Sequence, residues 1–539
     1  MLAAFVPGLA AAALLRPALR ARARTPCMEA IGADTRFEIL SGRVLSPGSS
    51  GDGWWDGRCA AMPVVLPPTP TRAKWQCYYY GRPSDKWNAD LPAFLPTGIS
   101  GLAESTDGLN WVRVAGPLEE GAILRPSDDA DAFDHVHVGI TDVFPLSGGS
   151  YAALYFGGSG EEVSLGMGPG PIKGFKMRPG AATSRDGSGL SWERSDAINP
   201  LLDVGAEGAW DSNFVSWPRA LPLDPTQPDG PWLMTYHALM PPGADAGGDG
   251  GGASGGPRWA VGAAMSEAGH ALGPYTKISL DGPVLRGGGP GSFDESGIGT
   301  RHVVHAAPPP GGGSGGGGDG GLVMVYEGVA ADGRHRLGLA TSADGKTWSK
   351  VEGLGPDPGG PCFEGAPAEV DAWDNGNVGT PWVVALPDGR WRLYYVGTSS
   401  KGRAVAIGAA EADSLLSAEW ARVGVSSSGL GVGGPGDERD DAGETALIVA
   451  AERGDTPLAR ALLAAGADAA AASASGWTAL HGAAECGSVA TLELLVDAGA
   501  DASAQAGSGK TPLDIARQYE RPAAVAALMK VGAAANLTA

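Results

Sequence analysis

Paired cysteines, long apolar runs and basic residues are all scarce in this chain of 539 residues. Its five cysteines are odd in number and form no C-x-x-C pair, which argues against a disulfide scaffold and against a zinc site, and favours reduced thiols inside a cell. No apolar run reaches the roughly 20 residues that a membrane-spanning helix needs. Lys and Arg total 39 against 60 Asp and Glu, and this net charge of -21 disfavours nucleic acid and anionic lipid. We therefore expect no cofactor, no metal, no nucleic acid and no membrane.

Acidic residues are missing from residues 1–28, which carry four arginines in a chain otherwise rich in acids. This asymmetry is typical of an organelle transit peptide, and we expect import into the chloroplast. A mitochondrial address stays open. So does a secretory signal, because an apolar stretch precedes A-L-R-A-R-A, although its basic residues follow the apolar run when they should precede it.

Glycine and proline, by contrast, are abundant, with 87 Gly and 42 Pro. Composition of this kind approaches that of disordered chains. However, 43% hydrophobic residues and 16 Trp carry far more apolar surface than a solvated chain would. The sequence therefore predicts a folded, loop-rich protein, and its length predicts more than one domain.

A repeat of 33 residues occupies the C-terminal part of the chain. G-E-T-A-L begins at Gly443, G-W-T-A-L at Gly476 and G-K-T-P-L at Gly509, and G-A-D at Gly466 returns at Gly499. The period, the T-A-L-x-x-A-A pattern and the closing G-A-D resemble the ankyrin repeat. The resemblance implies about three all-α repeats over 441–533, with a concave face that binds a protein partner.

A fainter repeat of about 80 residues fills most of the remaining chain. It opens on an aromatic residue followed by Asp, at spacings of 78, 77, 83 and 80 residues, namely at Asp56, Asp134, Asp211, Asp294 and Asp374. Each pair leads into two β-rich runs, and S-x-D-G turns follow at Ser105, Ser184 and Ser342. Five copies of a four-stranded unit predict an all-β five-bladed propeller over 53–424. A Gly-rich linker at 425–440 separates it from the ankyrin stack, and further Gly-rich tracts at 245–256 and 311–321 read as surface insertions.

The blade motifs resemble the five-bladed propeller glycoside hydrolases, the superfamily of invertase, levansucrase and arabinanase. The clearest stretches are residues 199–212, 282–286 and 298–348. The resemblance implies three carboxylates facing a central funnel, and the typical inner-strand carboxylate lies six residues after a blade-opening Asp. The five residues at this position, which we call position six, are not acidic: Met62, Ile140, Trp217, Thr300 and Thr380. This departure weighs against ordinary family catalysis.

Comparing the blades with one another identifies other candidate site residues. Two residues later, at position eight, the column reads Val64, Asp142, Arg219, His302 and Trp382. Because side chains alternate along a strand, positions six and eight are expected to share a face, so position eight would line the funnel mouth. A column in the second strand reads Tyr80, Phe156, His237, Glu327 and Val396, in which His237 and Glu327 interrupt apolar residues.

These columns lead to two hypotheses for function. In the first, Asp142 and Glu327 form the catalytic pair of a glycoside hydrolase, while Arg219 and Arg301 bind hydroxyl or carboxylate groups. Trp217 or Trp382 would stack on a sugar, and His237 and His302 would complete the lining. In the second, the propeller is catalytically degenerate and binds a glycan or a protein. His135 and His137 have the spacing of metal ligands on one strand face, but a lone H-x-H is a weak signal and we expect no metal site.

Overall fold

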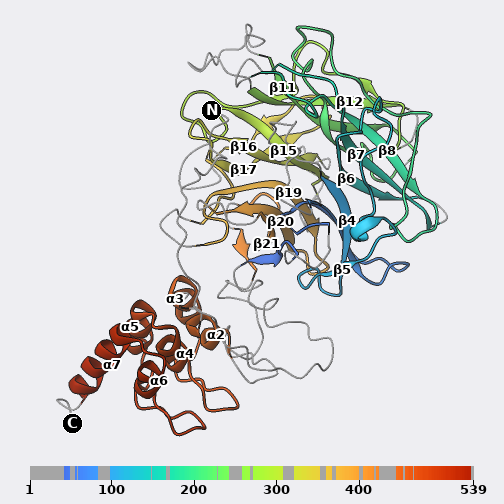
Figure 1. The fold of residues 1–539 in the computed structure, drawn as a ribbon. Coiled ribbons are helices and arrows are strands. Elements are labelled where there is room, and N and C mark those ends of the chain that lie inside the picture. The colour runs from blue at the N-terminus through green and yellow to red at the C-terminus, as the bar shows by residue number, and fades with distance from the viewer. Residues whose placement is uncertain are drawn as a thin grey trace. The chain divides into compact units, whose positions relative to one another are not determined.

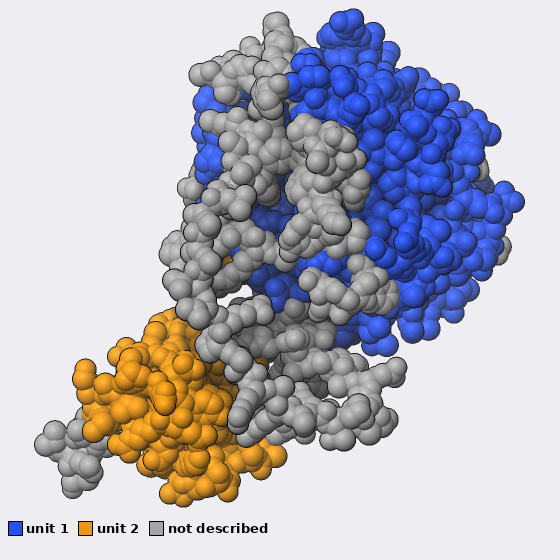
Figure 2. Space-filling model, in the orientation of Figure 1, with its two compact units in different colours: residues 1–26, 43–368, 373–420 blue, residues 27–42, 369–372, 421–539 orange. Residues whose placement is uncertain are grey.

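The computed structural model describes two compact units, which are considered separately (Figures 1 and 2). The described residues are 42–48, 55–57, 59–82, 98–146, 149–164, 170–227, 229–241, 258–267, 271–306, 321–352, 360–366, 372–399, 405–417, 420–423, 445–452, 454, 456–464 and 467–535. The predicted transit peptide, the linker and the Gly-rich tracts, except Gly321, lie outside them.

The first unit is built from four-stranded antiparallel blades. Blades one and two comprise β2 (Cys59–Leu66), β3 (Trp75–Arg82), β4 (Ile99–Ser105) and β5 (Val112–Val114), then β6 (His137–Pro145), β7 (Tyr151–Gly158), β8 (Met177–Ser184) and β9 (Glu193–Arg194). Blades three and four comprise β10 (Ser216–Pro222), β11 (Trp232–Met240), β12 (Arg258–Ser266) and β13 (Thr276–Lys277), then β15 (Gly297–His305), β16 (Leu322–Val329), β17 (His335–Ser342) and β18 (Ser349–Lys350). The short β14 (Leu285–Arg286) also pairs with β12.

The fifth blade contains strands from both ends of this unit. It comprises β19 (Asn377–Ala385), β20 (Trp391–Thr398) and β21 (Ala406–Ala412), and β1 (Arg43–Leu45) pairs antiparallel with β21. β22 (Ala421–Arg422) follows β21 in the chain. The inner strands contact one another in the closed order β2, β6, β10, β15, β19 and back to β2. This closed ring of five blades confirms the predicted propeller.

Every opening Asp has the same structural role. Its carboxylate accepts a hydrogen bond from a tyrosine hydroxyl of the second strand, at 2.9–3.2 Å in the pairs Asp56–Tyr79, Asp134–Tyr155, Asp211–Tyr236, Asp294–Tyr326 and Asp374–Tyr395. In four blades a cation of the outer strand also binds it, at 2.5–2.7 Å, namely Arg113, Arg194, Lys277 and Lys350. The aromatic–Asp repeat thus marks a buried bond that ties the inner, second and outer strands together.

The S-x-D-G motifs form the predicted turns between outer strands. The Ser105 hydroxyl donates to Asp107 at 2.8 Å, and Ser342 donates to Asp344 at 3.1 Å. Gly108 and Gly345 then adopt positive φ values of 76° and 71°, which glycine accommodates without strain.

The second unit contains three helix pairs that repeat every 33 residues: α2 (Ala446–Glu452) with α3 (Thr456–Ala464), α4 (Ala479–Cys486) with α5 (Val489–Asp497), and α6 (Pro512–Gln518) with α7 (Pro522–Ala535). The first helices stack as α2, α4 and α6, and the second helices as α3, α5 and α7. Their core is formed mostly by alanine and leucine, including Leu447, Leu480 and Leu495. Each pair buries its apolar face only against its neighbours, as a solenoid requires.

Candidate functional site

A β-bulge interrupts all five inner strands of the propeller at position six. The pairing register with the second strand shifts between Ala61 and Val64, Ile140 and Asp142, Ser216 and Arg219, Ile298 and Arg301, and Gly379 and Trp382. Met62, Trp217 and Thr380 adopt positive φ values of 55°, 50° and 44° there. A bulge breaks the alternation of side chains, so positions six and eight do not follow the two-residue rule on which their shared face was predicted.

The position-six side chains of blades one and three pack into an apolar cluster with residues of blades one and two. Met62 and Trp217 join Tyr80 and Phe156 in one buried cluster. The Trp217 ring stacks on Phe156 with 4.4 Å between ring centroids and an interplanar angle of 19°. The predicted sugar-stacking face of Trp217 is therefore covered by a neighbouring blade, and its side chain is 8% exposed.

Position eight forms a buried ring in which side chains bond to the backbone of a neighbouring blade. The Ala220 N–H donates to Asp142 Oδ2 at 3.0 Å, and the Val383 N–H donates to His302 Nδ1 at 3.0 Å. Trp382 Nε1 donates to the Val65 carbonyl at 2.9 Å. Every member of the column is at most 9% exposed, so these side chains are buried where the funnel mouth was predicted.

Three of the predicted site residues meet within this ring. The His302 ring stacks on Trp382 with 3.9 Å between centroids, and the guanidinium carbon of Arg219 lies 4.5 Å from the Trp382 ring centroid. Burial, together with the charge of Arg219, holds the pKa of His302 well below its ordinary value, so the imidazole is neutral. The comparison of blades thus identified residues that contact one another. These side chains interact with each other inside the protein.

Asp142 is the only carboxylic acid at position eight, and its pKa is strongly raised. Burial raises the pKa to about 7, against the charge of Arg219 and hydrogen bonds from the Ala220 and Val143 N–H groups. A carboxyl group of this kind is protonated in a large fraction of molecules at neutral pH, which is a property of general acids.

Glu327 is held in the ionised state. Thr300 Oγ1 donates to Oε2, the Thr380 N–H donates to the same oxygen at 3.1 Å, and His335 Nδ1 lies 2.5 Å from Oε1. Burial alone would raise the pKa, but the His335 contact and the other hydrogen bonds lower it to about 2. His335 was not among the predicted site residues. Its only sequence signal is a titratable group eight residues after Glu327, at the start of the next strand.

Asp142 and Glu327 belong to different hydrogen-bond networks. Asp142 on β6 bonds to blade three, whereas Glu327 on β16 bonds to residues of blades four and five, and the two share none of the partners described above. The hydrogen bonds thus hold each carboxylate between a different pair of blades.

Arg301 and His237 are buried beside blade three. Arg301 is 0% exposed; it donates from Nε to Thr235 Oγ1 at 3.2 Å and from Nη2 to the Thr235 and Trp217 carbonyls. The His237 ring lies 4.9 Å from that of Trp217 and 5.3 Å from that of Trp259. Burial and the charge of Arg301 lower the pKa of His237 to about 3, so it is neutral.

The H-x-H residues do not converge on a metal. His135 Nδ1 lies 2.9 Å from the Ser127 carbonyl and His137 Nε2 lies 2.6 Å from the Gly174 carbonyl. Among the residues that the structure describes, no group of three or more His, Cys, Asp or Glu side chains could hold a metal ion.

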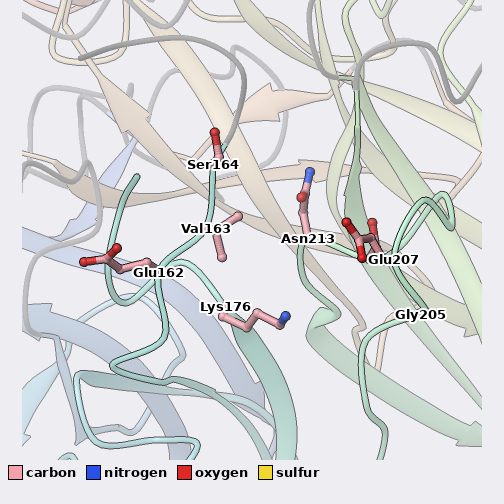
Figure 3. A pocket seen from close by; sticks show the side chains of 8 residues that line it. Glu162, Val163, Ser164, Lys176, Gly205, Glu207 and Asn213 are labelled. Carbon is pink, nitrogen blue, oxygen red and sulfur yellow. The ribbon is translucent and has the colours of Figure 1, made fainter. Parts of the chain in front are cut away.

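A polar cavity of about 320 Å³ lies between the β7–β8 loop of blade two and the segment that leads into blade three (Figure 3). Its lining comprises Glu162, Val163, Ser164, Lys176, Gly205, Glu207, Ser212 and Asn213. The lining thus includes residues with carboxylate, ammonium, hydroxyl and amide groups. None of these residues was predicted, because they lie in loops that differ from blade to blade.

The fold defines the class of protein as a β-propeller joined to an ankyrin-repeat stack. The family model "Ankyrin repeats (3 copies)" matches residues 430–506 and 447–539, which confirms the predicted repeats. No helix among the described residues is long and apolar enough to cross a membrane.

Solved structures similar to the chain include a glycoside hydrolase with 16% identity and a TM-score of 0.45, covering 69% of this chain and 94% of that one. Another is a glycosyl hydrolase from Bacteroides ovatus, with 16% identity and a TM-score of 0.42, covering 68% of this chain and 90% of that one. At this level of similarity, neither structure assigns a role to any residue of this chain. No curated protein matches the sequence.

Proposed function

We propose that this protein binds a carbohydrate through its propeller without hydrolysing it, and binds a protein partner through the concave face of its ankyrin repeats. The observation that carries the proposal is that Asp142 and Glu327 are only 5% and 8% exposed, and that each accepts a hydrogen bond from a backbone N–H of a neighbouring blade. Glycoside hydrolysis needs two carboxyl groups about 5–10 Å apart on either side of the scissile bond. None of the five residues at position six has a carboxyl group.

The protonation states of the two carboxyl groups also weigh against a catalytic pair. Glu327, with a pKa of about 2, holds no proton to donate at neutral pH, and hydrogen bonds engage both of its oxygens. A carboxylate that already accepts three hydrogen bonds is a poor base towards water and a poor nucleophile towards a sugar.

The polar cavity between blades two and three is where we place the carbohydrate. The carboxylate of Glu207 can accept hydrogen bonds from sugar hydroxyls, and Lys176 and Asn213 can donate them (Figure 3). Its volume of about 320 Å³ lies at the lower end of the range for small-molecule sites.

One observation favours hydrolysis as a second candidate function. The raised pKa of Asp142, about 7, is what a general acid requires. The test is hydrolysis of a panel of aryl glycosides and fructans by the wild-type protein and by Asp142→Asn. Hydrolysis that Asp142→Asn abolishes would establish the second candidate and overturn the first.

Binding itself is tested by affinity electrophoresis in gels that contain soluble polysaccharides. We expect retardation by at least one glycan, weakened by the double substitution Glu207→Gln with Lys176→Met. The matched control is Glu193→Gln, which changes an exposed carboxylate of the outer strand β9 outside the cavity. Retardation that is the same for wild type and the double variant would remove the cavity from the proposal.

The cellular address is also a proposal. The four arginines and the lack of acids in residues 1–28 favour import into the chloroplast. A fusion of these residues to a fluorescent protein tests this address, and mitochondrial or secreted fluorescence would overturn it.

A further inference from the structure

Buried polar atoms without a hydrogen bond gather around the inner end of blade three. Among the described residues, no partner is found for Nε and Nη1 of Arg219, Nη1 of Arg301, Nε1 of Trp217 and both ring nitrogens of His237. The Gly299 backbone lies near His237 and partly offsets the lowering of the His237 pKa, but it forms no hydrogen bond of good geometry with the ring. Buried polar groups are almost always paired, so a cluster of exceptions calls for a physical explanation.

These residues are neighbours in space. Arg301 reaches from β15 to the Thr235 carbonyl on β11 at 2.6 Å and also bonds to the Trp217 carbonyl. Thr235 is the residue paired with Arg219 across the β10–β11 ladder. The rings of His237 and Trp217 lie 4.9 Å apart. The four side chains thus come from the neighbouring strands β10, β11 and β15, and Arg301 bonds to both of the other strands.

The region also has an excess of positive charge. Arg219 is 2% exposed and Arg301 is 0% exposed. After burial, the charge of Arg219 is the next largest influence lowering the pKa of Arg301, so the two guanidinium groups repel each other. Asp142 offsets this only in part, because two backbone N–H groups engage it and its pKa lies near 7. His237 and His302 are neutral. Two buried cations facing one half-ionised acid are costly unless a further negative charge is present.

We infer that the propeller binds one small inorganic anion at its axis, between Arg219 and Arg301. The unpaired donors of both guanidinium groups and the indole N–H of Trp217 all donate, and none of these atoms can accept. A water molecule would satisfy donors but would leave the charge uncompensated, whereas an anion supplies both. The site links β10 to β15, and it is independent of the carbohydrate proposal because no residue of the polar cavity takes part.

Thermal unfolding of the full chain in different sodium salts tests the site. The protein is dialysed into sodium gluconate and titrated with sodium chloride, bromide or phosphate at constant ionic strength. We expect a saturable rise of the midpoint temperature with at least one anion, because a ligand that binds only the folded state stabilises it. A response to phosphate alone identifies an oxyanion site, and a response to chloride and bromide identifies a halide site. Midpoint temperatures that do not change with any of these anions at constant ionic strength would overturn the inference.

Two variants localise the effect. Trp217→Phe keeps an aromatic ring against Phe156 but removes the indole N–H, and should weaken the apparent anion affinity several-fold. Arg301→Met should abolish the salt-specific stabilisation. If that variant does not fold, Trp217→Phe and the anomalous signal of bromide in crystals of the wild-type protein carry the test. The matched control is Arg178→Met, which removes an arginine paired with Glu161 and Asp203 elsewhere in the propeller. Titrations identical in the wild type and both site variants would overturn the site, as would a response to chloride and bromide without a bromide peak between the two arginines.

Discussion

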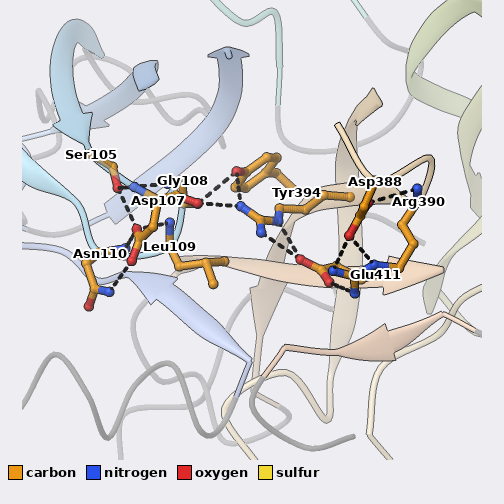
Figure 4. Close-up of polar contacts among 10 residues, drawn as sticks. Ser105, Asp107, Gly108, Leu109, Asn110, Asp388, Arg390, Tyr394 and Glu411 are labelled. Atoms are coloured by element: carbon orange, nitrogen blue, oxygen red, sulfur yellow. Dashed lines mark hydrogen bonds and ion pairs between the residues drawn. The ribbon is translucent and has the colours of Figure 1, made fainter. Parts of the chain in front are cut away.

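The Tyr394 hydroxyl donates a hydrogen bond of 2.8 Å to the Gly108 carbonyl, joining the last blade of the propeller to the first (Figure 4). Beside it, Arg392 donates to the Asp107 carbonyl at 2.8 Å and forms an ion pair with Glu411 at 2.7 Å. In other blades, the corresponding turn glycines also pack on the preceding blade, Gly189 near Tyr78 and Gly345 near Leu233. Ring closure therefore uses the same contact as two of the other blade interfaces, strengthened by polar bonds.

This contact predicts a measurable cost of weakening ring closure. Tyr394→Phe removes one buried hydrogen bond and leaves the Gly108 carbonyl without that donor, so the free energy of unfolding should fall by about 1–2 kcal/mol. Urea denaturation followed by tryptophan fluorescence measures it. As a control, Leu280→Ala changes a side chain that is 72% exposed and should alter stability by less than about 0.5 kcal/mol. Equal effects of the two substitutions would contradict this role of Tyr394.

The close approach of β19 to Glu327 predicts an intolerant glycine. A Cβ atom on Gly379 would lie 2.7 Å from Cδ of Glu327, which is fixed by hydrogen bonds on both oxygens. We expect Gly379→Ala to destabilise the protein by about 1–3 kcal/mol through overpacking, measured by urea denaturation. The matched control is Gly160→Ala, because a Cβ at Gly160 meets no atom within 4 Å. A Gly379→Ala protein as stable as the control would show that Glu327 moves freely.

Much of the architecture was predictable because repeats report it directly. The five opening Asp residues share one role, bonding to a tyrosine, so their periodicity alone located the blades. The 33-residue register likewise located the starts of α2, α4 and α6. Strand β1 was not predicted, because three residues that complete a blade more than 300 positions away leave no local periodic signal.

The site was less predictable for two physical reasons. The bulges at position six depend on backbone geometry, since Met62, Trp217 and Thr380 adopt positive φ without the glycine that would announce it. Burial was the second reason. The identities of Asp142, Arg219, His302 and Trp382 pointed to a polar column, but the sequence could not tell an exposed lining from buried side chains that bond to neighbouring blades.

Acid should weaken the protein partly through Glu327. Its pKa is about 2 in the folded state against an ordinary value of 4.5, so the unfolded state binds the proton first. The resulting stability is fully present above about pH 4.5 and is lost as the pH falls towards 2. Urea denaturation at several pH values should show that Glu327→Gln is less stable than the wild type at pH 6 and that the gap narrows below pH 4. A gap that stays constant from pH 6 to pH 3 would contradict the assignment.

Asp142 predicts the opposite pH dependence. Burial raises its pKa to about 7 from an ordinary value of 3.8, so between these values the folded state holds a proton that the unfolded state has released. The stability that comes from this group is therefore full below about pH 3.8 and is lost as the pH rises through 7. Asp142→Asn keeps an acceptor for the Ala220 N–H but cannot titrate, so its stability relative to the wild type should improve steadily from pH 4 to pH 7 and level off above. Denaturation curves of both proteins across this range measure the difference, and Asp186→Asn at an exposed turn, where the carboxyl pKa is lowered, should show no such improvement. A difference between Asp142→Asn and wild type that does not change with pH would mean that Asp142 is ionised throughout, and it would then be a permanent counterion of Arg219.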